Sequence, residues 1–372
     1  MGMGSKITKK AKELKGKATE VAPELTDKMQ PGHGRDAASR KDSTDEIISN
    51  SSWMGDIPND VLVTALSIPG THDSGCIEGP MGIAKTQNLD IPDQLNAGIR
   101  FLDIRLAHYQ DNLFVHHDVI YMGKSYKDVL RICADFLDRR PSETILMVVR
   151  EEDRADSSLG DFAPSEVVGR LTREESECRD NTRSFEEEFK GQTWEQEEAA
   201  PLFYNFSASS PGVDAGDNSS TFTPATTLGD VRGKIILLRG FQGGQGMGID
   251  VTHWLDDTAT RSDEDEHGNP RDTIPPVYHI EDHYSNPDGK YDLVVAHLEK
   301  ARSGKLEDLY ITFSSAVALK ADGYSQKINP RLNDYLAASP EGRIGIVVMD
   351  YFEEPRELVS NVIKMNSRSK VG

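Results

Sequence analysis

The sequence predicts an α/β protein, an irregular (β/α) barrel of the TIM type with parallel strands. The chain has 372 residues, which exceeds the roughly 250 residues that such a barrel needs. From residue 53 onward, short apolar runs alternate with amphipathic helical patterns, as they do in parallel sheets whose strands are joined by helices. Polar residues gather at the ends of several of these runs, and this is where barrel enzymes carry their active sites.

Seven short apolar segments are predicted to be strands. They are residues 61–68, 98–105, 113–117, 144–150, 234–239, 309–314 and 344–350. Seven or eight parallel strands fit a closed barrel, in which the first and last strands are neighbours. Six apolar residues at helical spacing predict a helix that ends before Pro141: Tyr126, Val129, Leu130, Cys133, Phe136 and Leu137. The acidic stretches 186–188 and 263–266 are expected to be solvated loops.

The chain divides into a leader, residues 1–52, and a catalytic barrel, residues 53–372. The leader is rich in Lys, Ala, Asp and Ser and has no strand-like run, so we expect it to be largely disordered. Its first 18 residues contain six lysines and one glutamate, a charge of +5, whereas the whole chain carries −20 and the other 354 residues therefore −25. Residues 7–19 are interpreted either as a basic helix on anionic lipid or as a solvated tail.

The composition disfavours several classes of protein. A net charge of −20 argues against nucleic acid as the partner, because phosphate contacts need clustered Lys and Arg. The mean hydropathy is −0.54, and the absence of a run of 18 apolar residues predicts no transmembrane segment. No apolar segment follows the first lysines, so we expect a cytoplasmic monomer, bound peripherally to a membrane if its leader binds lipid. The three cysteines match no zinc motif and are expected to be reduced.

Charged residues in two of the predicted strand regions are candidates for a site. The segment Thr71-His72-Asp73 follows the first strand. Along the second, Asp103 and Arg105 share one strand face, because side chains alternate. A buried arginine needs carboxylates or an anion such as phosphate as its partner, and Asp103 and Asp73 are the candidate carboxylates.

Two histidines and a further aspartate extend the candidate site. His116 and His117 are adjacent on a strand, so only one of them can face the interior. Asp350 ends the last strand, which would lie beside the first and bring this carboxylate next to His72. A carboxylate that orients one imidazole, together with a second imidazole and an arginine, suits phosphoryl transfer by general acid and base. Each of these residues, taken singly, also fits a structural role. Because they occur together at the ends of four strands, they favour a catalytic site.

The chain resembles a known family, the bacterial type of phosphatidylinositol-specific phospholipase C with its X-domain barrel. The resemblance extends from Trp53 to about Tyr351. Its motifs are residues 68–75, 98–105, 115–117, 141–145, 228–235 and 328–330, in the family's order.

The resemblance implies a two-step reaction that releases diacylglycerol and inositol 1,2-cyclic phosphate. His72 would take the proton of the inositol 2-hydroxyl, and His117 would protonate the diacylglycerol oxygen. Arg105 would stabilise the phosphoryl oxygens, Asp73 would couple to His117 and Arg105, and Asp350 would orient His72. Relatives in eukaryotes hold calcium where this chain has Asp73 and Arg105, so no metal or other cofactor is expected.

The resemblance also implies residues for the inositol headgroup: Arg150, Glu152, Arg239, Asp282 and Tyr284. Arg150 replaces a lysine of the family, and an ungapped alignment puts Gly240 rather than Arg239 at the family's arginine. The expected partner is phosphatidylinositol or a related phospholipid at a membrane surface. Two alternatives remain open, namely a phosphodiesterase of the same fold with another phospholipid or a soluble inositol phosphodiester as substrate, and a lipid-binding barrel without activity.

Overall fold

The computed structural model describes residues 50–79, 84–117, 120–152, 181–194, 202–204, 222–244, 247–255, 257–273, 276–316 and 321–367. These residues belong to one compact unit, formed by Ile47–Arg154 and Cys178–Gly372. The expectations for the leader up to residue 49, and for Cys178, lie outside the described residues. Within the described residues, no helix is both long and apolar enough to cross a membrane.

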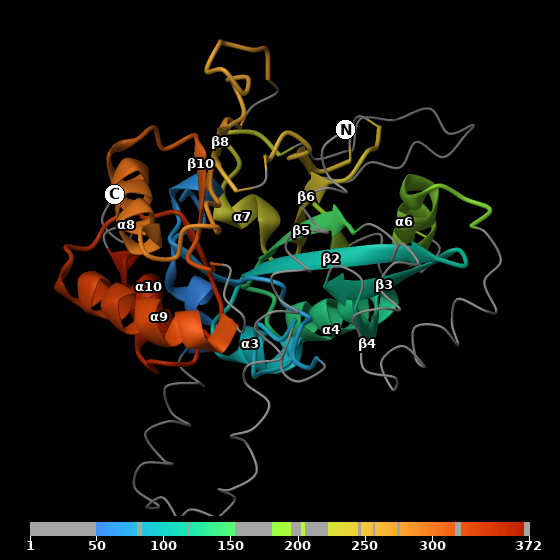
Figure 1. The fold of residues 1–372 in the computed structure, drawn as a ribbon, viewed down its shortest axis with the longest axis horizontal. Coiled ribbons are helices and arrows are strands. Elements are labelled where there is room, and N and C mark those ends of the chain that lie inside the picture. The colour runs from blue at the N-terminus through green and yellow to red at the C-terminus, as the bar shows by residue number, and fades with distance from the viewer. Residues whose placement is uncertain are drawn as a thin grey trace, which may run out of the picture. The chain divides into compact units, whose positions relative to one another are not determined.

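Most of the strands form a curled, largely parallel sheet with helices between them (Figure 1). The strands run in the order β7-β6-β5-β2-β1-β11-β10-β9-β8. Their bounds are β1 Ile68–Thr71, β2 Phe101–Tyr109, β5 Ile145–Glu151, β6 Ile235–Gly240, β7 Ile249–Asp250, β8 Ala259–Arg261, β9 Tyr278–Glu281, β10 Leu309–Phe313 and β11 Ile346–Met349. The first strand, β1, and the last, β11, pair in parallel, with Ile68 opposite Ile346. The prediction that the first and last strands are neighbours is therefore confirmed.

The helices lie between the strands, and most of them pack on the outer face of the sheet. They are α3 Ile91–Asn96, α4 Tyr126–Arg139, α6 Phe185–Trp194, α7 Leu228–Val231, α8 Lys290–Ser303, α9 Ala321–Ala338 and α10 Leu358–Lys364. Figure 1 shows α9 and α10 side by side. The helix predicted before Pro141 is confirmed as α4, and a capping box between Ser125 and Asp128 starts it.

Two of the strand predictions need correction. Residues 61–68 form a strand only from Ile68, because Val63–Ala65 is a 3-10 turn. Val63 in this turn and Leu66 directly after it pack against the apolar side chains of the barrel interior instead. The side chain of Trp53 donates to the carbonyl of Gly98, just before β2 (2.9 Å), so residues 53–66 cover the end of the barrel where the strands begin.

The segment at residues 113–117 is part of an antiparallel hairpin rather than a parallel barrel strand. It is β3, Asn112–His117, which pairs with β2 and with β4, Ile120–Ser125. Only Gln110 and Asp111 connect β2 to β3, and both have positive φ, as in the two-residue turns of hairpins. A parallel pairing would need a crossover connection of a dozen or more residues.

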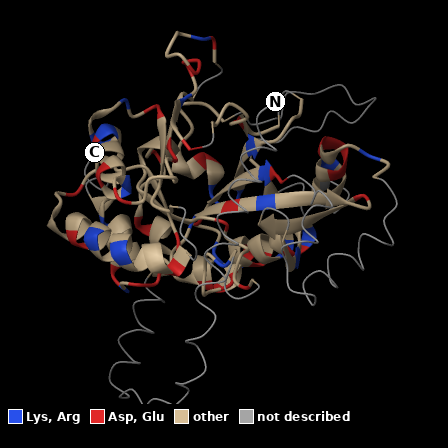
Figure 2. Ribbon diagram, in the orientation of Figure 1, with Lys and Arg blue, Asp and Glu red and all other residues tan. Residues whose placement is uncertain are grey.

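The acidic stretches differ from each other. Residues 186–188 are not a loop but the first turn of α6, where carboxylates are favourable because the N-terminus of a helix is positive. Residues 263–266 lie in the irregular connection after β8, as expected. Figure 2 shows acidic and basic residues interspersed on the described elements, including next to one another along β2.

Candidate active site

The inward-facing side chains change from apolar to polar toward the carboxyl ends of the strands. Three strands share this pattern: Ile346, Val348 and Asp350 at β11; Tyr278, Ile280 and Asp282 at β9; Leu146, Val148 and Arg150 on β5. On β2 the inward positions are Phe101, Asp103 and Arg105, whereas Leu102 and Ile104 pack under the helices. Because parallel strands end at the same edge, their polar residues gather at one mouth of the barrel.

His72 lies directly after β1 and contacts two carboxylates. Its Nδ1 is 2.8 Å from Oδ1 of Asp350, and its Nε2 is 3.3 Å from Oδ2 of Asp73. Burial alone would lower the pKa of His72, but the charges of Asp73 and Asp350 outweigh burial and raise the pKa to about 9. The ring of Phe313 packs edge-on against the imidazole, with centroids 6.0 Å apart.

Two amide side chains that the sequence analysis missed fix the backbone around this pair. Gln87 donates to the carbonyls of His72 (2.8 Å) and Met349 (2.9 Å). Asn329 donates to the carbonyls of Asp350 (2.9 Å) and Tyr351. Asn329 belongs to one of the family-like motifs, residues 328–330, but nothing in its type indicated a backbone partner 21 residues away.

Asp73 connects both histidines to Arg105. It adopts a left-handed backbone conformation with φ of 44°, which Asp tolerates better than most residues. Its Oδ1 is 2.8 Å from Nε of Arg105, and its Oδ2 is 3.5 Å from Nδ1 of His117. Burial favours the neutral acid, but Arg105 and the two histidines outweigh it and lower the pKa of Asp73 to about 2.

Arg105 is held by three carboxylates around its guanidinium. Besides Asp73, its Nη2 is 3.2 Å from Asp103 and its Nη1 is 3.6 Å from Glu152. These charges keep the pKa of Arg105 well above its usual range in spite of burial. The expected pairing with Asp73 and Asp103 is therefore present, and the side chain remains 18% exposed, so the cation can be reached from the mouth.

His117 and His116 differ in environment, as the alternation along a strand predicts. His117 contacts Asp73 and, through Nδ1, the carbonyl of Ala84 at 2.9 Å. The ring of His116 lies instead against Tyr121 of β4, with centroids 5.8 Å apart. Asp118 lies outside the described residues.

The structure brings three of the five expected headgroup residues to the mouth. Arg150 lies over the ring of Trp254, with Cζ 4.5 Å from the centroid, and Glu152 contacts Arg105. Asp282 accepts from the indole nitrogen of Trp254 (3.1 Å). Its pKa is raised to about 6, because burial outweighs the cations nearby. Tyr284 follows in the next loop, where its backbone N–H donates to Asp257 (2.8 Å).

The structure does not bring Arg239, a residue expected to bind the headgroup, to the mouth. Its guanidinium donates to the carbonyls of Met247 (3.1 Å) and Phe241 and to the carboxylate of Asp250, on the helix side of the sheet. Gly240 occupies the inward position, where a Cβ would lie 2.8 Å from Cγ of Arg150. Arg150 thus fills the space that a longer side chain at position 240 would take. Trp254 was not anticipated, since no strand pattern surrounds it.

Two groups of side chains among the described residues could hold a metal ion: Asp73 with Cys76 and His117, and His72 with Asp73 and Asp103. In the second group, both carboxylates already contact the guanidinium of Arg105. A divalent cation there would compete with a fixed positive charge for the same oxygens. The arrangement therefore suits metal-independent stabilisation of an anion by Arg105.

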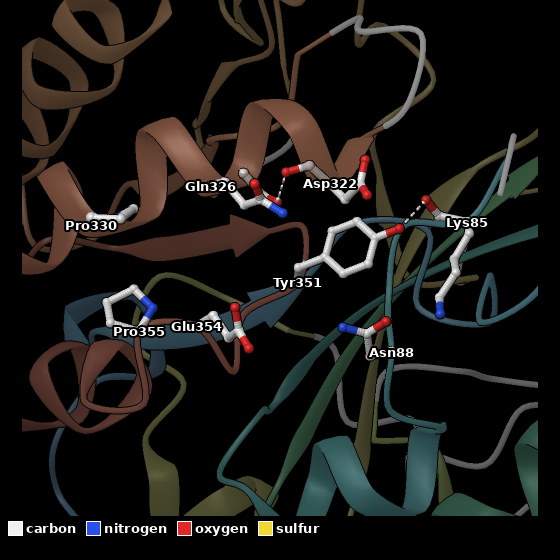
Figure 3. A pocket seen from close by; sticks show the side chains of 9 residues that line it. Lys85, Asn88, Asp322, Gln326, Pro330, Tyr351, Glu354 and Pro355 are labelled. Atoms are coloured by element: carbon white, nitrogen blue, oxygen red, sulfur yellow. Dashed lines mark hydrogen bonds between the residues drawn. The ribbon is translucent and has the colours of Figure 1, made fainter. Parts of the chain in front are cut away.

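A pocket of about 440 Å³ has Tyr351, the residue after Asp350, in its lining (Figure 3). It is lined by Lys85, Asn88, Asp322, Ser325, Gln326, Pro330, Tyr351, Glu354 and Pro355. The Tyr351 hydroxyl donates to the carbonyl of Lys85 (2.8 Å). None of the residues expected to act in catalysis lines this pocket, so the open mouth around Arg105 remains the candidate site.

The chain is similar to known proteins over most of its length. Residues 60–165 match the family model described as PI-PLC X 1. The chain is 27% identical over 338 residues to a 1-phosphatidylinositol phosphodiesterase of Staphylococcus aureus, covering 86% of this chain and 95% of the relative. It is 25% identical over 331 residues to the protein of the same name in Listeria monocytogenes, with 86% of each chain covered.

A solved structure has a similar fold. A mutant of the phosphatidylinositol-specific phospholipase C of Staphylococcus aureus superimposes with a TM-score of 0.67 at 25% identity, covering 87% of this chain and 99% of that chain. The resemblance to bacterial phosphatidylinositol-specific phospholipases C, and the TIM-like barrel that it implies, are confirmed.

Proposed function

We propose that this chain is a metal-independent phosphatidylinositol phospholipase C, which cleaves its lipid to diacylglycerol and inositol 1,2-cyclic phosphate. The names of its relatives support a phosphodiesterase that acts on phosphatidylinositol. One observation carries the finer proposal: the imidazoles of His72 and His117 both contact Oδ2 of Asp73, whose Oδ1 contacts Arg105.

In the proposed reaction the phosphodiester binds at Arg105. With Nδ1 of His72 donating to Asp350, Nε2 accepts the proton of the inositol 2-hydroxyl, and that oxygen forms a bond to phosphorus. The bond from phosphorus to the diacylglycerol oxygen breaks, and this oxygen takes its proton from His117. Arg105 offsets the charge on the phosphoryl oxygens, and Asp73 stabilises the protonated His117.

Phosphorus NMR of the products formed from phosphatidylinositol in the presence of EDTA tests this proposal. A cyclic phosphodiester that appears before any phosphomonoester is the expected result. Turnover that requires added calcium, or a first product that is a linear phosphomonoester, would contradict the metal-independent mechanism.

A second candidate is a phosphodiesterase with the same catalytic residues but a different headgroup or a soluble substrate. The observation that favours it is the displacement of Arg239 from the mouth, with Gly240 and Arg150 in its place. Comparing kcat/KM for phosphatidylinositol with that for glycerophosphoinositol separates the two. A preference for glycerophosphoinositol would support the second candidate.

A further inference from the structure

Cys76 is fixed beside the candidate active site but has no part in the proposed reaction. It lies in the turn after β1, where its N–H donates to the carbonyl of Asp73 (2.9 Å) and its own carbonyl accepts from the N–H of Thr86 (2.9 Å). The turn packs closely on β3, since a Cβ at Gly75 would lie 2.6 Å from Val115. The backbone of Cys76 is therefore held in place, and its side chain is fully buried.

The thiol lies near two other potential ligands of a metal ion. Atoms of Asp73, Cys76 and His117 all lie within 4.8 Å of one another. Oδ2 of Asp73 and Nδ1 of His117 are 3.5 Å apart. Two such ligands at about 2.0 to 2.2 Å from one tetrahedral ion are separated by roughly 3.4 Å. Thiolate, imidazole and carboxylate together are ligands that zinc accepts and that calcium and magnesium do not prefer.

Asp73 provides an independent indication of a ligand. Its side chain is buried, and within the described residues neither carboxylate oxygen accepts a hydrogen bond of normal geometry. Arg105 contacts Oδ1, whereas Oδ2 faces the histidines. A cation bound at Oδ2 would replace the contacts of this oxygen with the imidazoles, whereas Oδ1 would keep its contact with Arg105.

We propose that Asp73, Cys76 and His117 form an inhibitory site for a borderline-soft divalent cation, of which Zn²⁺ is the representative. An ion bound there replaces the contact between His117 and Asp73 and the hydrogen bond of Nδ1 to Ala84, so His117 cannot act as the acid. The side chain of His117 is 26% exposed, which gives a hydrated ion access. Binding displaces the proton of the thiol, as in other cysteine sites. Inhibition rests on the proposed function, whereas binding does not.

Co²⁺ absorption spectra of the full chain test the binding directly, because a thiolate ligand adds a charge-transfer band to cobalt in the near ultraviolet. Wild-type protein should show this band at one Co²⁺ per chain, and Zn²⁺ should abolish it. The band should be absent in Cys76→Ala and Cys76→Ser, and it should persist in the matched controls Cys133→Ala and Cys178→Ala. Loss of the band in either control, or a wild type without it, would overturn the proposal.

Inhibition by free Zn²⁺ is then measured with a soluble inositol phosphodiester. Cys76→Ala should retain the basal rate of the wild type and need at least about tenfold more Zn²⁺ for half-inhibition, because even the loss of a group that only supports a ligand weakens metal binding by about 10- to 100-fold. Equal inhibition of wild type and variant would exclude Cys76 as a ligand. Inactive wild-type protein that still shows the cobalt band would refute the proposed function and leave the metal site intact.

Discussion

At the scale of residues, the two histidines that contact Asp73 are expected to dominate the chemistry. His72→Ala and His117→Ala should each reduce kcat by about 10²- to 10⁴-fold or more, as the removal of a general acid or base does. His116→Ala is the matched control, because its ring contacts Tyr121 rather than Asp73, and it should change kcat only slightly. If His116→Ala were the more damaging variant, the assignment of strand faces on β3 would be wrong.

The charge of Asp350 should control the pH at which His72 works. In this arrangement His72 has a pKa of about 9, so kcat/KM for a soluble substrate should have one limb near that pH. Asp350→Asn removes a negative charge 2.8 Å from Nδ1, lowers the pKa of His72 and should move this limb to lower pH. A limb that stays in place would show that His72 is not the group that titrates.

The contact between His72 and Asp350 also predicts how the stability of the fold depends on pH. Because folding raises the pKa of His72 above 6.5, its ion pairs with Asp73 and Asp350 stabilise the fold fully below about pH 6.5, and this contribution disappears as the pH rises through about 9. The free energy of unfolding, from urea titrations, should therefore differ between wild type and Asp350→Asn at neutral pH and converge at about pH 10. A difference that does not change with pH would contradict the assignment.

Alternation along the predicted strands is enough to predict many of the site residues. The contacts that hold these residues in place could not be predicted in this way. Alternation alone places Asp103 and Arg105 on the inner face and separates His117 from His116. The left-handed conformation of Asp73, which points one carboxylate at Arg105 and two imidazoles, has no signature in the sequence. Arg239 illustrates the limit, because a shift of one residue along β6 exchanges the inner and outer faces. The ungapped alignment puts Gly240 at the family's arginine position, and Gly240 is the residue that lies beside Arg150.

At the scale of elements, the close packing of β5 on β6 should matter for the headgroup. A Cβ at Gly240 would lie 2.8 Å from Cγ of Arg150 and 3.1 Å from the carbonyl of Val149. Gly240→Ala should therefore displace Arg150 and raise KM for phosphatidylinositol several-fold, with a smaller effect on kcat. Gly323→Ala is the control, because a Cβ there would meet nothing within 4 Å. Equal KM values for both variants would remove Arg150 from the headgroup site.

Most of the strands that could be predicted have a continuous apolar run in the sequence. The apolar runs of β5, β6, β10 and β11 predict these strands, and the helical spacing of apolar residues predicts α4. The strand β9 was missed because its four residues, Tyr-His-Ile-Glu, alternate in polarity and follow a long irregular connection. The hairpin of β2 and β3 was misread because strand pattern alone does not give direction, although its two-residue connection excludes a parallel pairing.

At the scale of the whole molecule, the site should need no metal for turnover. Arg105 already occupies the position between Asp73 and Asp103 and supplies the positive charge that calcium would otherwise provide. EDTA should therefore leave kcat nearly unchanged, and calcium should raise it by no more than a few-fold. A requirement for millimolar calcium would contradict this.

The charge distribution along the chain predicts a role for the leader at membranes. The first 18 residues carry +5, against −25 on the rest, so an anionic surface attracts one end of an enzyme that it otherwise repels. Each lysine near such a surface contributes about 1 kcal/mol, and salt screens this attraction. Deletion of residues 1–45 should therefore reduce sedimentation with phosphatidylserine-containing vesicles, most strongly at low salt, while hydrolysis of a soluble inositol phosphodiester stays unchanged. A variant in which the six lysines become glutamine, with the leader otherwise intact, separates charge from length and should behave like the deletion. Equal sedimentation of all three proteins would show that the leader does not bind lipid and that the barrel alone meets the membrane.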